Sequence, residues 1–198
     1  SLDKIYDEII QKFNTNPIIV KCDLNDLDES KAQEFANAIQ GSYERLDGIV
    51  NNAAIIGKMS TLADYDLSTW QKVININVTS SYVLTKYLVP LMEGSKNPRI
   101  IFTSSGVAEK GRAYWGAYAV SKAAVKSLAE LTKTPVPDIV NMAYNEKSIS
   151  FGPNYIIPKP LDPRLLTTVA PAVAKAAMES GVAQQPINNW ETYANNLN

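Results

Sequence analysis

Three tyrosines in this sequence are each followed four residues later by a lysine, a spacing that suits proton transfer. The pairs are Tyr82–Lys86, Tyr118–Lys122 and Tyr155–Lys159. On a helix the side chains at i and i+4 share a face, and an ammonium about 5 Å from a phenol interacts by roughly 3 kcal/mol at an effective dielectric near 20. Such a phenol releases its proton more readily, so it can act as an acid or a base near neutral pH.

The surroundings of each pair decide whether the spacing has meaning, because chance alone predicts roughly one such pair in a chain of this composition. The first pair lies within a long amphipathic helical pattern, and Pro158 interrupts the third pair. Only Tyr118 is preceded by a serine pair, Ser104–Ser105, at the end of a β-like run, where a hydroxyl could orient a substrate oxygen towards the phenol. The alternative interpretation is that these serines merely leave the strand and that Tyr118 packs.

The residue types narrow the chemistry further, since the sequence has no histidine and Cys22 is its one cysteine. Ser–His and Cys–His catalysis, histidine metal sites, thiolate clusters and an internal disulfide are therefore excluded, and we expect no metal site. A net charge of −1 gives no basic field for nucleic acid, and no apolar run approaches the roughly 18 residues of a membrane span. Residues 1–14 lack the apolar core of a signal peptide. We expect a cytoplasmic protein.

The elements that must position these residues alternate between helical and strand patterns up to about residue 133. Strands alternating with helices of this size favour a parallel sheet with helices on both faces. The periodicity predicts helices at 1–13, 29–43, 69–92 and 114–133, and strands at 17–24, 46–53 and 99–103.

The composition changes beyond Lys133, where eight of the eleven prolines lie. The stretch 151–165 has four prolines, so it can form neither a central strand nor a helix interior. A helical pattern returns at 165–180, where Pro171 marks a kink or a first turn, and a last short helix is expected at 189–197. We therefore predict two parts, residues 1–133 and a Pro-rich, mostly helical tail at 134–198.

Four motifs occur in a familiar order and at suitable distances over the first part of the chain. They are Asn51-Asn52-Ala53-Ala54, Ile74-Asn75-Ile76-Asn77-Val78, Thr103-Ser104-Ser105 and Tyr118-Ala119-Val120-Ser121-Lys122. Over about residues 1–130 the set resembles the short-chain dehydrogenase/reductase family. The resemblance implies a Rossmann-like α/β fold, a three-layer structure with a parallel sheet between helices. It also implies oxidoreductase activity that uses NAD or NADP to interconvert a small-molecule carbonyl and an alcohol.

The resemblance assigns a catalytic role to four residues. Tyr118 would be the general acid/base, and Lys122 would make it more acidic and hold the nicotinamide ribose. Ser105 would bind the substrate oxygen, and Asn77 would hold a water that links Lys122 to solvent.

The cofactor residues implied by the same resemblance are Asp23, Asn51 and Ala53, together with Tyr118 and Lys122. Asn51 and Ala53 would lie beside the cofactor, and Asp23 would meet the adenine. Without the family pattern, Asn51 would be interpreted as a polar turn at a strand end and Asp23 as an exposed turn carboxylate.

One part of the family pattern is missing, because no two glycines in this sequence are separated by a single residue. The glycine-rich turn that cradles the pyrophosphate at a helix N-terminus is therefore absent, and the N-terminal βαβ unit is incomplete. Other segments fill the resulting gap in the sheet, or the strand order changes, or the sequence lacks an upstream part. We expect impaired cofactor binding, and the alternative hypothesis is a non-catalytic chimeric α/β fragment or scaffold that binds no cofactor.

The second part of the chain resembles a different family. Over about residues 123–198, and above all at 135–140, 151–164 and 170–181, the sequence is similar to the C-terminal part of bacterial malic enzymes. No metal ligand or catalytic residue of that family is carried over, and Asp162 and Arg164 are interpreted as a local ion pair or cap. The two resemblances overlap within one helix, so the chain has the pattern of a chimera. Helices 69–92 and 114–133 resemble those by which the dehydrogenase family dimerises, so a homo-oligomer is expected.

Overall fold

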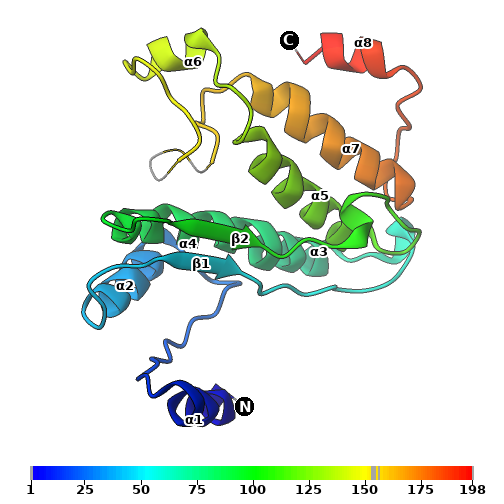
Figure 1. Cartoon of the computed structure of the whole chain (residues 1–198). Coiled ribbons are helices and arrows are strands. Elements are labelled where there is room, and N and C mark those ends of the chain that lie inside the picture. Colours follow the sequence, from blue (N-terminus) through cyan, green and yellow to red (C-terminus); the bar gives the residue numbers. More distant parts are fainter. Residues whose placement is uncertain (1, 153–154, 156, 198) are drawn as a thin grey trace.

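The computed structural model describes residues 2–152, 155 and 157–197 (Figure 1). Strands β1 (Gly48–Asn51) and β2 (Arg99–Phe102) pair in parallel, with Gly48 opposite Arg99. The helices are α1 (Leu2–Phe13), α2 (Glu29–Gln40), α3 (Leu67–Ile74), α4 (Ser80–Leu88), α5 (Gly116–Leu131), α6 (Asp138–Ala143), α7 (Ala170–Glu179) and α8 (Trp190–Asn195). Short 3-10 turns lie at Leu62–Asp64, Val89–Met92 and Gly106–Ala108, and π-turns lie at Asn75–Thr79 and Leu165–Val169. The predicted class, an incomplete Rossmann-like α/β fold, is confirmed with a sheet two strands wide.

Aspartates begin two of the predicted helices by satisfying backbone N–H groups that have no partner within the helix. The Asp28 carboxylate accepts a hydrogen bond from the Lys31 backbone N–H at 2.8 Å at the start of α2. Asp66 does the same for the Thr69 N–H at 2.7 Å at the start of α3. The Ser68 hydroxyl and the Thr69 N–H together lower the pKa of Asp66 to about 2, so this cap keeps its charge in mild acid.

The long helix predicted at 69–92 forms, but it is not one regular α-helix. The π-turn Asn75–Thr79 separates α3 from α4, and the 3-10 turn Val89–Met92 follows α4. Pro90 explains the second change because it has no N–H to donate to the preceding turn. A π-turn inserts one residue into the helical repeat, and such turns are frequent at functional sites. Here the inserted turn carries the buried Asn77.

The strand predicted at 17–24 is wrong. This segment is extended but pairs with no strand among the described residues. A strand needs a neighbour to take up its backbone N–H and C=O groups, and the apolar pattern of this segment supplies no neighbour. Its side chains stay partly in solvent, including Ile18 and Ile19, and the Tyr43 hydroxyl donates to the Asn16 carbonyl at 3.0 Å.

One face of the two-stranded sheet holds a core, whereas the other face is open. Ile49 of β1 packs with residues of α2, α4 and the turn after α4, namely Ala36, Leu88 and Met92. Figure 1 shows α2 and α4 behind the strands. On the opposite face, Val50 is 63% exposed and Ile101 is 54% exposed. Each strand therefore alternates between a core side and a solvent side.

The C-terminal segment is joined to the first part of the chain through helix packing. Helix α7 lies along α5 (Figure 1), and Pro171, which has no backbone N–H, directly follows the π-turn Leu165–Val169 at the start of α7. The predicted helix at 189–197 is present as α8, capped by the Asn189 side chain. Helix α6 was not predicted from the sequence, because its six residues directly after Pro137 are too few to show a period. The boundary at residue 133 stays a prediction.

A buried ion pair anchors the Pro-rich stretch. The Asp162 side chain is fully buried, and the Arg164 guanidinium donates to both of its carboxylate oxygens. The same guanidinium donates to the Pro135 carbonyl at 2.6 Å and to the Tyr155 hydroxyl at 3.1 Å. Burial on its own would raise the pKa of Asp162, but the hydrogen bonds and charge of Arg164 hold it below the ordinary value. The pair is local, as the sequence indicated.

Replacing Arg164 with methionine is expected to lower the free energy of unfolding by about 3–5 kcal/mol at pH 7, because it leaves a buried carboxylate unpaired. The native pKa of Asp162 lies below its unfolded value of about 3.9, so the pair contributes fully above that pH and loses its contribution as the pH falls through the native pKa. The difference between the two proteins should therefore shrink in acid. Urea unfolding between pH 7 and pH 3 measures it.

The matched control is Arg112→Met, because Arg112 is exposed and forms no ion pair among the described residues. This control should change the free energy of unfolding by less than about 0.5 kcal/mol. An Arg164→Met protein as stable as the native one at pH 7 would show that the buried pair does not anchor the stretch.

Candidate active site

Tyr118 and Lys122 lie on one side of α5. The Lys122 amine is 5.7 Å from the centroid of the Tyr118 ring, so phenol and cation are neighbours. Tyr118 is half-buried and packs obliquely on Trp115, whereas Lys122 is only 5% exposed. The i and i+4 spacing on a regular helix produces this arrangement.

The Lys122 amine is fixed by the end of strand β2. Its Nζ donates a hydrogen bond to the Thr103 carbonyl at 2.6 Å, and burial lowers the pKa of the amine. An ammonium has three donors, and the carbonyl uses one of them. The two remaining N–H groups can donate to an oxygen of a bound ligand. The buried amine therefore has one fixed acceptor and two donors left for a ligand.

Asn77 connects the loop after β1 to α5. Its amide donates to the Ile55 carbonyl at 2.9 Å and to the Ser121 hydroxyl at 3.0 Å, and its side-chain oxygen accepts from the Ile55 N–H at 2.9 Å. The Ser121 hydroxyl in turn donates to the Tyr118 carbonyl at 2.8 Å. Because Asn77 is 3% exposed, these bonds form inside the protein and set the position of the loop relative to Tyr118.

Ser105 stands where β2 ends and the chain turns towards α5. It precedes the 3-10 turn Gly106–Ala108, which packs against α5. Its hydroxyl oxygen accepts only a long hydrogen bond, 3.5 Å, from the Val107 N–H. No hydrogen bond joins Ser105 to Tyr118 among the described residues. The hydroxyl can still donate to a ligand.

The predicted cofactor residues have different surroundings. The Asn51 amide donates to the Thr85 hydroxyl at 3.0 Å and is therefore held by α4. Ala53 is exposed just beyond β1. Asp23 is exposed in a turn, where its carboxylate accepts from the Asn25 N–H at 2.9 Å. Asn51 and the exposed Ala53 thus both lie at the carboxyl end of β1, whereas Asp23 lies in a separate turn.

Several contacts around the site were not predicted from the sequence. The Thr103 hydroxyl donates to the Asn52 side chain at 2.8 Å and ties the ends of the two strands together. Gly111 and Gly116 admit the end of α7 beside the segment between Ser105 and Tyr118. A Cβ at Gly111 would lie 2.6 Å from the Glu179 Cβ, and one at Gly116 would lie 2.8 Å from a Val182 methyl carbon. The available signal was glycine itself, which permits close approach.

A large cavity of about 580 Å³ lies elsewhere, between β2, α5 and Phe151. Ser104 and Val125 are among its lining residues, but Tyr118 and Lys122 are not. The candidate site at Tyr118 and Lys122 therefore rests on the contacts between these residues and not on the size of a cavity. No helix in the described part of the chain has the length and apolarity that a bilayer crossing requires.

Comparison with known proteins agrees with this geometry. A family model described as short chain dehydrogenase matches residues 1–139. The chain belongs to the short chain dehydrogenase family. Its relatives include the uncharacterized oxidoreductase YciK of Escherichia coli K12, 33% identical over 130 residues, which cover 66% of this chain and 52% of YciK. The family assigned from the four motifs is thereby confirmed.

Solved structures of short chain dehydrogenases share the fold. One from Escherichia coli CFT073, complexed with NADPH, matches with a TM-score of 0.62 and 34% identity over 66% of this chain and 55% of that one. One from Shigella flexneri matches with a TM-score of 0.62 and 25% identity over 93% of this chain and 74% of that one.

The malic enzyme resemblance is confirmed as well. The NADP-dependent malic enzyme of Escherichia coli K12 is 55% identical over 75 residues, which are 38% of this chain and 10% of that protein. The chain thus spans about half the length of YciK and about a tenth of the malic enzyme.

Replacing Asn77 with alanine should destabilise the short chain dehydrogenase core. The change leaves the Ile55 N–H and C=O without their partner, at a cost of about 1–3 kcal/mol. Urea unfolding measures the effect. The control is Asn75→Ala in the same π-turn, since Asn75 makes no side-chain hydrogen bond among the described residues. Equal stability of the two variants would argue against the Asn77 bridge.

Proposed function

We propose that this chain is an NAD(P)-dependent oxidoreductase that interconverts a carbonyl and an alcohol, with Tyr118 as the general acid/base. The observation that carries the proposal is the buried Lys122 amine, held by the Thr103 carbonyl and lying 5.7 Å from the Tyr118 ring centroid. In this arrangement the phenol would give a proton to a carbonyl oxygen and take it back from an alcohol.

Two further residues support the reaction. The Ser105 hydroxyl would donate a hydrogen bond to the substrate oxygen, which strengthens as negative charge develops there. Asn77 would act as a positioning residue through its bonds to Ile55 and Ser121, because they hold the helix turn that carries Tyr118. A water beside Asn77 that connects Lys122 to solvent belongs to the same proposal.

The residues present fit one half of the cofactor better than the other. The spare donors of Lys122, with Asn51 and Ala53 at the carboxyl end of β1, would hold the nicotinamide and its ribose, and Asp23 would meet the adenine. The cofactor supplies the hydride when it is bound. No Gly-x-Gly turn exists in this sequence to receive the pyrophosphate, so we infer weak binding by these 198 residues. The NADPH complex of a relative supports this cofactor class.

Replacing Tyr118 with phenylalanine should abolish carbonyl reduction, by at least about 100-fold, because the proton donor is removed. The fold should persist, since the change deletes one oxygen atom. Oxidation of NADPH in the presence of a panel of small aldehydes and ketones measures the rate, and circular dichroism checks the fold.

The matched control is Tyr82→Phe. Tyr82 also has a lysine four residues on, but Lys86 forms an ion pair with Glu29 and lies over the Tyr87 ring. The control should retain the full rate. Turnover that survives in the Tyr118→Phe protein would rule out the site.

The second candidate is a scaffold that binds no cofactor, favoured by the absence of the glycine turn. A titration of NADPH, followed by its fluorescence, separates the two candidates. We expect binding in the range of about 10 μM to 1 mM, weakened about tenfold or more by Lys122→Met. Binding that Lys122→Met leaves unchanged, or none at millimolar NADPH, would favour the scaffold.

We also propose that the segment similar to short chain dehydrogenases and the segment similar to malic enzymes were joined within α5.

A further inference from the structure

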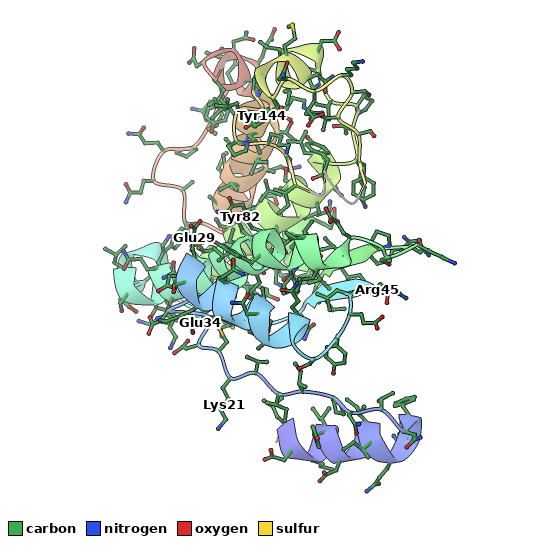
Figure 2. All side chains as sticks on the ribbon, turned by 90° about the vertical axis from the view of Figure 1, so that its left-hand side faces the viewer. Lys21, Glu29, Glu34, Arg45, Tyr82 and Tyr144 are labelled. Carbon is green, nitrogen blue, oxygen red and sulfur yellow. The ribbon has the colours of Figure 1, made fainter. Side chains whose placement is uncertain are left out.

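Helix α1 exposes an apolar stripe that no other described residue covers. None of its residues is buried, and Leu2, Ile5 and Phe13 are 61%, 55% and 68% exposed. Figures 1 and 2 show the helix apart from the rest of the molecule, at the end of an extended segment. A helix of 12 residues is marginal in water on its own, so α1 needs an apolar surface to persist.

A second uncovered apolar surface lies on the sheet. The face opposite α2 and α4 carries Gly48, Val50, Arg99 and Ile101, and we name it the open sheet face. Arg99 and Ile101 also line one wall of the 580 Å³ cavity between β2 and α5. Val50 and Ile101 stand directly opposite each other in the register and are both more than half exposed. Gly48 adds no side chain, so a helix can approach the strands closely there.

The charges beside the two surfaces are complementary. Arg99 on the open sheet face donates to the Pro98 carbonyl at 2.9 Å and forms no ion pair among the described residues. On α1, Asp3 and Asp7 stand one helical turn apart beside the apolar stripe, and likewise form no ion pair among those residues. Opposite charges at the rim of an apolar contact fix its register.

The sizes also match what a stable dimer requires. A standard interface uses roughly 20–30 residues from each partner, and each copy would contribute the 12 residues of α1, within the N-terminal arm at residues 2–24, as well as its open sheet face. Residues 14–24 are largely extended and can span about 35 Å at roughly 3.3 Å per residue. This reach lets each arm cross to a second molecule, and a two-fold arrangement counts every contact twice.

We propose that two copies of this chain exchange their N-terminal arms, with α1 of each copy packed on the open sheet face of the other. Leu2, Ile5 and Phe13 of one copy cover Val50 and Ile101 of its partner copy, and Asp3 and Asp7 meet Arg99. The arrangement is independent of the proposed enzymatic function and differs from association through α4 and α5.

Analytical ultracentrifugation of the full chain over a concentration series from about 1 to 100 μM tests the proposal. We expect a monomer–dimer equilibrium whose dissociation constant rises at least about tenfold in Ile5→Glu and in Ile101→Glu. Met142→Glu is the matched control, because Met142 is 72% exposed on α6, and it should leave the equilibrium unchanged. A chain that stays monomeric throughout overturns the proposal, as does a dimer that Ile5→Glu leaves unchanged.

A charge exchange makes the test specific without placing a charge on an apolar site. Arg99→Glu alone, and Asp3→Lys with Asp7→Lys alone, should each weaken the dimer about threefold to tenfold. The three substitutions together should restore it, because the opposite charges face each other again. Failure of the combined variant to recover, with all variants folded by circular dichroism, would place α1 elsewhere. Recovery excludes an arm folded back on its own sheet, since that form has the monomer mass.

Discussion

The hydrogen bond from the Lys122 amine to the Thr103 carbonyl holds the candidate site together. It joins the end of β2 to the middle of α5, so the serine that follows the strand and the tyrosine on the helix share one frame. A buried amine without an oxygen acceptor would be costly, and the carbonyl meets that need. The end of β2 is fixed by this hydrogen bond and by a second one, from the Thr103 hydroxyl to the Asn52 side chain at the end of the neighbouring strand.

Asn77 complements this link from the other side. The π-turn directs its amide inward, where it bonds to the loop after β1 and to the helix that carries Tyr118. Lys122 and Asn77 together fasten three segments that are distant in the sequence. The candidate site is thus held by hydrogen bonds that form inside the protein, and such bonds favour a fixed geometry.

The sequence predicted much of this fold, and its failures have physical causes. Helices α2 and α5 were predicted because their apolar periods are long and regular, and β2 because its apolar run is short and bounded. The segment 17–24 has equally good strand composition, but a strand depends on a partner that composition does not reveal. The family motifs located Tyr118, Lys122 and Asn77. The contacts of these residues, and the hydrogen bond from the Asn51 amide to the Thr85 hydroxyl, could not be predicted because they depend on how the elements pack together.

The close approach of the end of α7 to Gly111, and of Val182 beyond it to Gly116, constrains substitution at both glycines. Neither glycine has a side chain, so the segment that ends α7 and the residue Val182 beyond it can lie against the backbone there. A single carbon atom added at Gly111 would meet the Glu179 Cβ at 2.6 Å, and one added at Gly116 would meet a Val182 methyl carbon at 2.8 Å. The two glycines should therefore tolerate substitution less well than exposed positions of α7 itself.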